Sequence, residues 1–210
     1  RDISNTKQQG QKVKLLAVTK THPKQTLKQA AELGIQCFGE NKVQEAEAKA
    51  PHLPQNTELH LIGHLQSNKI KRALKIFNVI QTVDSLSLAE KINQNAIKIN
   101  KTQRIYCQIN IGKDPNKTGF MTQEMKNNIE TIMMFSNLST EGIMTILPFG
   151  LGNKETKKLY KETKKIRDEI SKLYNIELEL SMGMSNDYKI AIECGATLVR
   201  IGTKLFGKRR

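Results

Sequence analysis

The sequence is poor in cysteine, and the cysteines that it has are scattered. Cys37, Cys107 and Cys194 lie far apart, each in or beside an apolar segment. This spacing is typical neither of a disulfide framework nor of a metal-binding cluster, and scattered free thiols are typical of a reducing compartment. We therefore expect a cytoplasmic protein without a bound metal.

Long apolar runs are also absent. No segment has the roughly 20 consecutive apolar residues that cross a membrane, and the polar start RDISNTKQQG lacks the apolar core of a signal peptide. The first residue is Arg1 rather than Met, which is consistent with a longer native N-terminus. Hydrophobic residues make up 38% of the chain, and 210 residues suffice for one domain, residues 1–210, with a proper core.

Acidic residues are too few to balance the basic ones, so the formal net charge is +14. The lysines are spread over polar helix faces instead of forming one tract. Few aromatic residues accompany them, since tryptophan is missing and aromatics total 5%. Net charge of this kind supports non-specific affinity for anions and says nothing about the fold. We expect no specific nucleic-acid partner and no membrane partner.

Short runs of branched apolar residues alternate with helical patterns along the whole chain. Strands are expected at about 13–19, 35–38, 58–62, 78–83, 104–111, 140–145, 176–181 and 197–201, and helices at about 24–33, 41–50, 66–76, 85–99, 123–135, 154–173, 185–194 and 203–206. This alternation predicts an α/β fold that consists of a single (β/α)8 TIM barrel. A doubly wound open sheet is the alternative, but Lys20-Thr21-His22-Pro23 stands where its glycine-rich phosphate turn would be.

The first predicted strand ends at Lys20. A lysine at the carboxyl end of a barrel strand points toward the mouth, where apolar walls disfavour the ammonium form, and the neutral amine is a nucleophile toward aldehydes. Lysine is abundant in this chain, so from this stretch alone a solvated lysine at a strand end is the preferred interpretation. Other polar residues expected near the mouth are Glu40, Asn41, His60 and Asn110, and His60 is as well explained as a core histidine.

Two glycine turns late in the chain suggest a phosphate site. SMGMS (181–185) is expected to open a helix with Ser185 as its N-cap, and RIGT (200–203) follows the last strand. Barrels often hold phosphate on the loops after strands seven and eight, although two tight turns and a cap would look the same. A lysine facing a phosphate cradle suits an aldehyde that carries a phosphate, such as pyridoxal 5′-phosphate or a phosphorylated sugar aldehyde.

The chain also resembles a known family in seven blocks that occur in order. The blocks are LLAVTKTHP (15–23), FGENKVQEAEAK (38–49), HLIGHLQSNKIK (60–71), TVDS (82–85), QINIGKDPNKTGF (108–120), GIMTI (142–146) and LSMGMSNDYKIAIECGATLVRIGTKLFG (180–207). They resemble the pyridoxal phosphate homeostasis proteins, the YggS/PROSC-like family. The resemblance implies the alanine racemase N-terminal-domain-like barrel, a fold-type III cofactor-binding barrel, without the C-terminal β domain of alanine racemase.

The resemblance also implies a site and a role. Pyridoxal phosphate would be held as an internal aldimine on Lys20, with its phosphate on Ser185, Gly202 and Thr203. An arginine matching Arg200 would approach the pyridine nitrogen, and the side chains that match Asn41 and Met182 would line the pocket. The implied role is intracellular homeostasis of this cofactor without strong turnover. We expect a monomer, with apo enzymes that use the cofactor as acceptors.

A low-activity amino-acid racemase is the alternative function. An arginine at the ring nitrogen favours the unprotonated nitrogen and so weakens the cofactor as an electron sink. A racemase also needs a second base, and we expect Tyr106, Tyr160, Tyr174 and Tyr188 to lie away from the mouth. Two segments depart from the family pattern: residues 1–11 are short for the usual first helix, and ILPFGLG (146–152) is an unusual loop.

Overall fold

A closed barrel of eight parallel strands forms the centre of the molecule. The structure is a computed structural model that describes residues 2–207. The strands are β1 (Lys14–Val18), β2 (Cys37–Glu40), β3 (Glu58–Leu61), β4 (Val79–Val83), β5 (Gln103–Ile109), β6 (Leu138–Thr145), β7 (Glu179–Ser181) and β8 (Leu198–Ile201). Each strand pairs with the next in sequence, and β8 pairs with β1 to close the ring, with Leu16 opposite Arg200.

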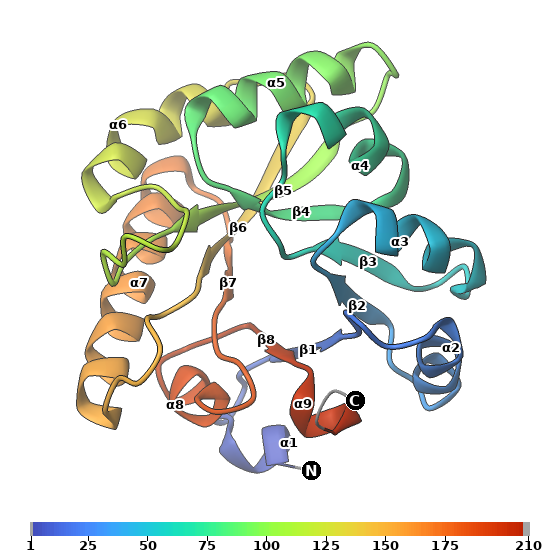
Figure 1. Ribbon diagram of the computed structural model, residues 1–210. Helices are drawn as coiled ribbons and strands as arrows, with labels where there is room; N and C mark the ends of the chain where they lie inside the picture. The colour runs from blue at the N-terminus through green and yellow to red at the C-terminus, as the bar shows by residue number, and fades with distance from the viewer. Residues whose placement is uncertain (1, 208–210) are drawn as a thin grey trace.

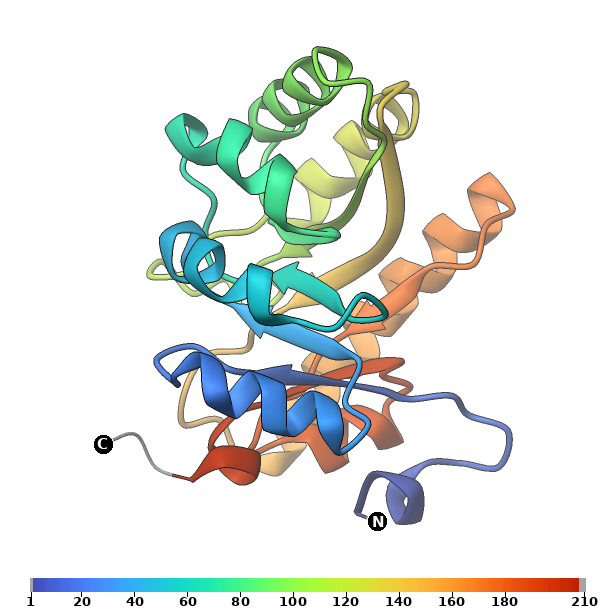
Figure 2. The same cartoon turned by 90° about the vertical axis from the view of Figure 1, so that its right-hand side faces the viewer.

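Helices follow the strands and form the outer layer of the barrel (Figure 1). They are α1 (Asp2–Thr6), α2 (Lys24–Glu32), α3 (Val43–Lys49), α4 (Ile70–Ile76), α5 (Leu86–Ile97), α6 (Thr122–Met133), α7 (Asn153–Tyr174), α8 (Tyr188–Glu193) and α9 (Thr203–Phe206), with short 3-10 turns η1 (Ala50–His52) and η2 (Ser67–Lys69). Turned by 90°, the same ribbon shows helices packed along the outside of the strands (Figure 2). No helix in the described part of the chain is long and apolar enough to cross a membrane.

The predicted order of strands and helices is confirmed, and the predicted barrel with it. Ser85 caps α5 as expected, since its hydroxyl accepts a hydrogen bond from the backbone N–H of Leu88 at 3.2 Å. The second strand begins two residues later than predicted, at Cys37, and the seventh covers only Glu179–Ser181. Propensity alone does not fix such ends, because pairing with neighbouring strands decides them.

Two apolar layers surround the strands. Side chains such as Ala17, Phe38 and Leu61 belong to the large core between barrel and helices. Alternate residues face inward, where Leu16 and Val18 pack with smaller clusters inside the ring. Because both faces are apolar, the strands read as nearly continuous hydrophobic runs. Some of the buried polar side chains stand within these runs, among them His60, Gln81 and Arg200.

The N-terminal segment packs on the side of the barrel beside α8. Figure 1 shows α1, α8 and α9 gathered at one side of the ring, and α1 contacts α8. The Gln11 side chain donates to the carbonyl oxygens of Ile192 and Ala196, both at 3.0 Å. These bonds fasten the segment that leads into β1. In the loop after β6, Phe149 is 94% exposed and so covers none of the core.

Candidate functional site

Lys20 lies two residues beyond the end of β1, and its side chain is partly buried. The backbone on both sides of it is fixed. Thr19 is fully buried, its N–H donates to the carbonyl of Gly39 at 3.1 Å, and its carbonyl accepts from His22 N at 3.1 Å. Thr21 has a positive φ of 68°, which non-glycine residues adopt only where the surroundings hold them there. The position of Lys20 is therefore determined by the fold.

A buried ionic cluster holds this turn, and we name Thr19, Glu40, Glu45 and Lys49 the Lys20 clamp. Lys49 Nζ donates to the Thr19 carbonyl at 2.7 Å, to Glu40 Oε1 at 2.8 Å and to Glu45 Oε1 at 2.6 Å. The Thr19 hydroxyl donates to Glu40 Oε1 at 2.7 Å, and Glu45 Oε1 accepts from the N–H of Thr21 at 2.5 Å. The clamp thus grips the residues immediately before and after Lys20.

Glu40 is the most confined member of the clamp. Its side chain is 0% exposed, and its second oxygen, Oε2, has no hydrogen-bond partner among the described residues. Burial raises the pKa of Glu40, although its hydrogen bonds from Lys49 and Thr19 act in the opposite direction. The Lys49 ammonium is therefore what makes a charged carboxylate tolerable at this place.

The turns that follow β7 and β8 lie against each other and against the end of β1. Ser185 Oγ is 3.4 Å from the backbone N–H of Lys204, which links the two turns. A Cβ on Gly202 would come within 3.2 Å of the Val18 carbonyl oxygen, so a larger residue there would crowd the end of β1. Gly183 has φ = 93°, and a Cβ there would lie 2.5 Å from the Ala191 Cβ. Ser185, Gly202 and Thr203 are brought together as the sequence predicts.

The predicted helix cap at Ser185 is wrong. The helix α8 begins at Tyr188, Asp187 occupies the cap position, and its Oδ1 accepts from the N–H of Met184 at 2.7 Å. The residues SMGMS instead form an open turn, because Gly183 with its positive φ ends the strand and Asp187 ties the backbone behind it. An anion held by this turn would rest on turn N–H groups and hydroxyls and not on the start of α8.

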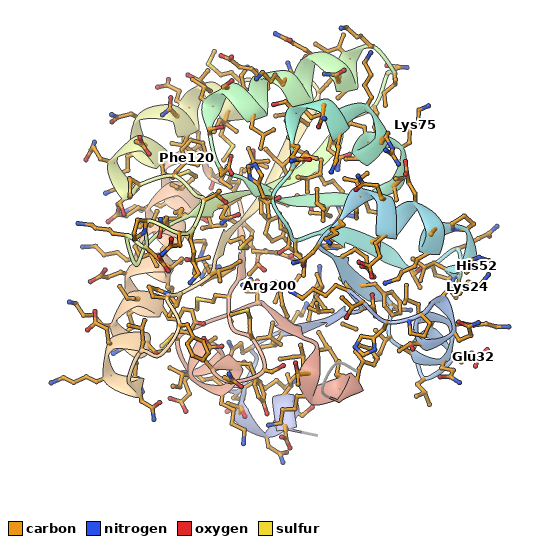
Figure 3. The ribbon with its side chains drawn as sticks, viewed as in Figure 1. Lys24, Glu32, His52, Lys75, Phe120 and Arg200 are labelled. Carbon is orange, nitrogen blue, oxygen red and sulfur yellow. The ribbon has the colours of Figure 1, made fainter. Side chains whose placement is uncertain are left out.

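Arg200 lies inside the barrel and anchors a buried hydrogen-bond chain. Figure 3 shows it among the strands, far from Lys24 and His52 at the rim. Its Nη1 donates to Ser181 Oγ at 2.7 Å, and its Nη2 donates to the Thr145 carbonyl at 2.8 Å. Burial lowers the pKa of Arg200, yet a guanidinium stays protonated in proteins. Two of its five N–H groups are used in these bonds, so further donors can face a ligand.

The hydrogen-bond chain continues from Ser181 through the barrel interior to His60. Ser181 Oγ donates to Gln81 Oε1 at 2.7 Å, and Gln81 Nε2 lies 2.8 Å from His60 Nδ1. Because Arg200 can only donate, it sets the direction: Ser181 passes its hydrogen to the Gln81 carbonyl, and the Gln81 amide donates to His60. His60 is thereby a core histidine at a distance from Lys20, and burial lowers its pKa.

Two further predicted residues directly follow strands at the carboxyl end of the barrel. Met182 is fully buried directly after β7. Asn41 follows β2, and its Oδ1 is buried without a hydrogen-bond partner among residues 2–207. An orphaned acceptor of this kind is what a hydroxyl group of a bound molecule would satisfy. Asn110, by contrast, is structural, because its side chain bonds Asp114 and Lys117 within the 112–119 loop.

The tyrosines follow the prediction only in part. Tyr106 donates to Glu179 at the opposite end of the barrel, and Tyr174 ends α7. Tyr160, however, reaches the turn after β7 and donates to Asp187 Oδ2 at 2.6 Å. The hydroxyl of Tyr188 lies 3.1 Å from Lys204 Nζ, beside the turn after β8. Both of these hydroxyls thus bond side chains in or beside the turns after β7 and β8.

Sequence reasoning missed Lys49 and Gln81. Lys49 looks like any other lysine on a polar helix face, yet it is 6% exposed. Gln81 stands within the apolar run of β4, and this is a signal that could have found it, since an uncharged polar residue there must face the barrel interior.

With this geometry in view, the chain can be compared with known proteins. The family profile "Alanine racemase, N-terminal domain" matches residues 1–210. A pyridoxal phosphate homeostasis protein of Synechocystis is 40% identical over 200 residues, covering 94% of this chain and 92% of that protein. One of Aquifex aeolicus is 37% identical over 199 residues, covering 94% and 87%.

Solved structures share the fold. PipY of Synechococcus elongatus with pyridoxal phosphate bound has a TM-score of 0.86 and 36% identity, covering 93% of this chain and 92% of that one. An alanine racemase of Clostridium difficile has a TM-score of 0.81 at 16% identity, and the match covers 99% of this chain but 58% of the racemase. The second likeness concerns the barrel alone.

Proposed function

The chain belongs to the pyridoxal phosphate homeostasis protein family, built on the barrel of the alanine racemase N-terminal domain, and we propose that it binds pyridoxal 5′-phosphate and serves the intracellular homeostasis of this cofactor. The observation that carries the proposal is the convergence of Lys20 with the two turns after β7 and β8 at one end of the barrel. Lys20 would hold the aldehyde carbon, and Ser185, Gly202 and Thr203 would hold the phosphate.

The residues present fit this cofactor. Gly202 leaves open the space that a side chain would fill against Val18, and the turn hydroxyls and N–H groups are suitable donors to a phosphate. The orphaned Oδ1 of Asn41 can accept a hydrogen bond from a ligand hydroxyl, and the buried Met182 side chain would supply an apolar wall. When bound, pyridoxal phosphate supplies an electron sink for reactions at the α-carbon of amino acids.

Arg200 is the reason to propose storage and delivery over rapid turnover. It presents only hydrogen-bond donors, and a donor can pair only with an unprotonated ring nitrogen. Its bonds to Ser181 and to the Thr145 carbonyl hold the guanidinium in place. A carboxylic acid, which could pair with a protonated ring nitrogen, therefore cannot take its position. We propose that release to apo enzymes that use the cofactor is the function, and that the protein acts as a monomer.

Trapping with borohydride tests the proposal. We expect protein purified with the cofactor to be yellow and reduction to leave one pyridoxyl group on Lys20, as located by peptide mass mapping. Lys24 is the matched control, because it lies in the next helix and contacts His52 at 3.2 Å instead of the clamp. Lys20→Ala should abolish the label and Lys24→Ala should retain it. A label that survives Lys20→Ala would overturn the assignment.

A low-activity racemase is the competing function, favoured by the shared barrel and by Lys20. It predicts α-proton exchange of alanine in heavy water above the rate that free cofactor gives.

A sugar-phosphate aldolase would instead be trapped with a phosphorylated sugar and would carry no yellow colour. Sedimentation of the loaded protein distinguishes the proposed monomer from a dimer.

A further inference from the structure

A cluster of metal-binding side chains lies at the lower end of the barrel, away from the turn that holds Lys20. Cys37 opens β2 and Glu58 opens β3, and His60 follows two residues later. Cys37 Sγ is 3.3 Å from His60 Nε2, which in turn is 3.3 Å from Glu58 Oε2. All three ligand atoms lie within 4.8 Å of one another. We propose that Cys37, Glu58 and His60 form a binding site for a zinc-like divalent cation.

The distance between the sulfur and the ring nitrogen matches the size of such an ion. With a zinc–sulfur bond of about 2.3 Å and a zinc–nitrogen bond of about 2.0–2.1 Å, tetrahedral geometry separates sulfur and nitrogen by about 3.5 Å. The observed 3.3 Å therefore needs only a small adjustment. Thiolate, imidazole and carboxylate together suit borderline ions such as zinc and cobalt and disfavour magnesium and calcium.

The charges around the cluster also favour a cation, although the chain as a whole is strongly basic. Lys14 pairs with Glu179 at 2.5 Å, and Arg104 bonds both Glu58 and Glu141. Three carboxylates thus face two cationic side chains, which leaves one negative charge in excess. Binding would release the thiol proton to solvent, because the thiolate is the ligand, and this adds a second negative charge. A divalent ion would neutralise both.

The hydrogen-bond partner of His60 can support coordination. Coordination through Nε2 requires the ring proton on Nδ1, where a second-shell acceptor should receive it. In the hydrogen-bond chain from Arg200 to His60 the Gln81 amide donates to Nδ1 at 2.8 Å, so metal binding would require the amide to turn over and offer its oxygen to the Nδ1 proton. Ser181 Oγ would then accept from both Gln81 and Arg200 and would turn its own hydrogen away from Gln81. Three protein ligands leave a fourth position for water, and a cavity of about 550 Å³ that Cys37, Glu58 and Asn56 help to line gives access to solvent.

The sequence could not show this site, because the three residues come from two strands and the other cysteines lie elsewhere. A metal here would fasten the first residues of β2 and β3, at the end of the barrel opposite to the proposed cofactor. The inference does not depend on the cofactor proposal.

Cobalt alone is the probe. The full-length protein is treated with a chelator, titrated with Co²⁺, and followed by absorption in the red part of the visible spectrum, where pyridoxal phosphate does not absorb. We expect the strong bands of a tetrahedral site with a thiolate ligand at one ion per chain, and zinc should displace them. Cys37→Ser and His60→Gln should each weaken cobalt binding by more than about tenfold. Loss of an outer-shell partner alone weakens metal binding by about tenfold or more, so loss of a direct ligand should exceed that value.

Two control variants separate this site from surface binding. Cys194→Ser removes another buried thiol, and His64→Gln removes an exposed imidazole that lies 3.0 Å from Asp84 and could hold an adventitious ion. Both should keep the bands. Circular dichroism without metal checks that Cys37→Ser folds, and anomalous diffraction at the zinc edge locates the ion in the wild-type protein. Absence of the bands in folded wild-type protein, or bands that persist in Cys37→Ser, would overturn the proposal.

Discussion

Removal of the Lys49 ammonium is the sharpest test of how the fold positions Lys20. Lys49→Met keeps most of the stem and deletes the three hydrogen bonds to Thr19, Glu40 and Glu45. Among residues 2–207, Glu40 is then left as a buried carboxylate with only the Thr19 hydroxyl as a partner. Breaking a buried pair from one side costs about 3–5 kcal/mol, a large part of the roughly 5–15 kcal/mol by which domains are stable.

The pH dependence of this loss follows from Glu40. Burial already raises its pKa in the folded wild-type protein above the ordinary 4.5, and deletion of Lys49 raises the pKa further. Between the unfolded and folded pKa values the folded state binds the extra proton, so stability falls as pH rises. Acidification of the variant from pH 7 to 5.5 should therefore restore up to about 2 kcal/mol, at about 1.4 kcal/mol for each pH unit.

Urea unfolding at the two pH values measures both effects. Glu40→Gln combined with Lys49→Met should recover much of the stability, because no charge is then buried without a partner. The matched control is Arg72→Met, which breaks the exposed pair of Arg72 with Glu47 and should change little. The clamp reasoning is refuted if Lys49→Met loses the same stability at both pH values, or if the double variant is no better than the single one. The borohydride label on Lys20 should fall in parallel with the loss of the clamp.

Three further outcomes are expected. Gly183→Ala should lower both thermal stability and cofactor affinity, because the new Cβ would lie 2.5 Å from the Cβ of Ala191. Gly150→Ala is the control, since Gly150 has a similar φ and a Cβ there would have no atom of the described residues within 4 Å; its melting curve should show the effect of backbone strain alone. Gln81→Leu should destabilise the fold by about 1–3 kcal/mol in urea by leaving its buried partners unsatisfied, and equal stability would contradict the proposed chain. Burial lowers the pKa of His60 below its ordinary 6.5 in the folded protein. Below pH 6.5 the unfolded state therefore binds more protons than the folded state, so stability falls as the pH is lowered. His60→Gln should make stability less dependent on pH in this acidic range.

Much of the fold could be predicted from the sequence, because its signals are local. Short apolar runs such as residues 16–18 are buried on both faces, and turn glycines such as Gly183 and Gly195 mark where strands and helices end. Ser85 was found because a cap depends on a residue and its neighbours three positions on. Ser185 was misplaced because the choice between Ser185 and Asp187 as the start of α8 depends on tertiary contacts of the turn.

The residues of the candidate site likewise fall into those that local sequence signals predict and those that depend on tertiary contacts. Lys20, Gly202 and Thr203 follow strands directly, so the barrel rule alone places them at one end. Lys49 could not be found this way, because nothing in a helical lysine tells which lysine is turned inward. The many lysines on helix faces hide Lys49, whose ammonium meets a buried carboxylate.

The hydrogen-bond chain from Arg200 to His60 could be predicted in part. Each of its residues shows a signal in the sequence, but the signal is informative only when several strands are compared. Within the apolar runs of four strands, His60, Gln81, Ser181 and Arg200 each stand beside residues of the outer core, such as Ile80 next to Gln81. Period-two geometry then forces all four side chains into the barrel. Buried polar groups must be paired, and inside a barrel their partners can only come from other strands, so each predicts the others. Polar residues at inward positions of a closed barrel should therefore be treated as one network from the start. Here that network joins the proposed cofactor end to the proposed metal end.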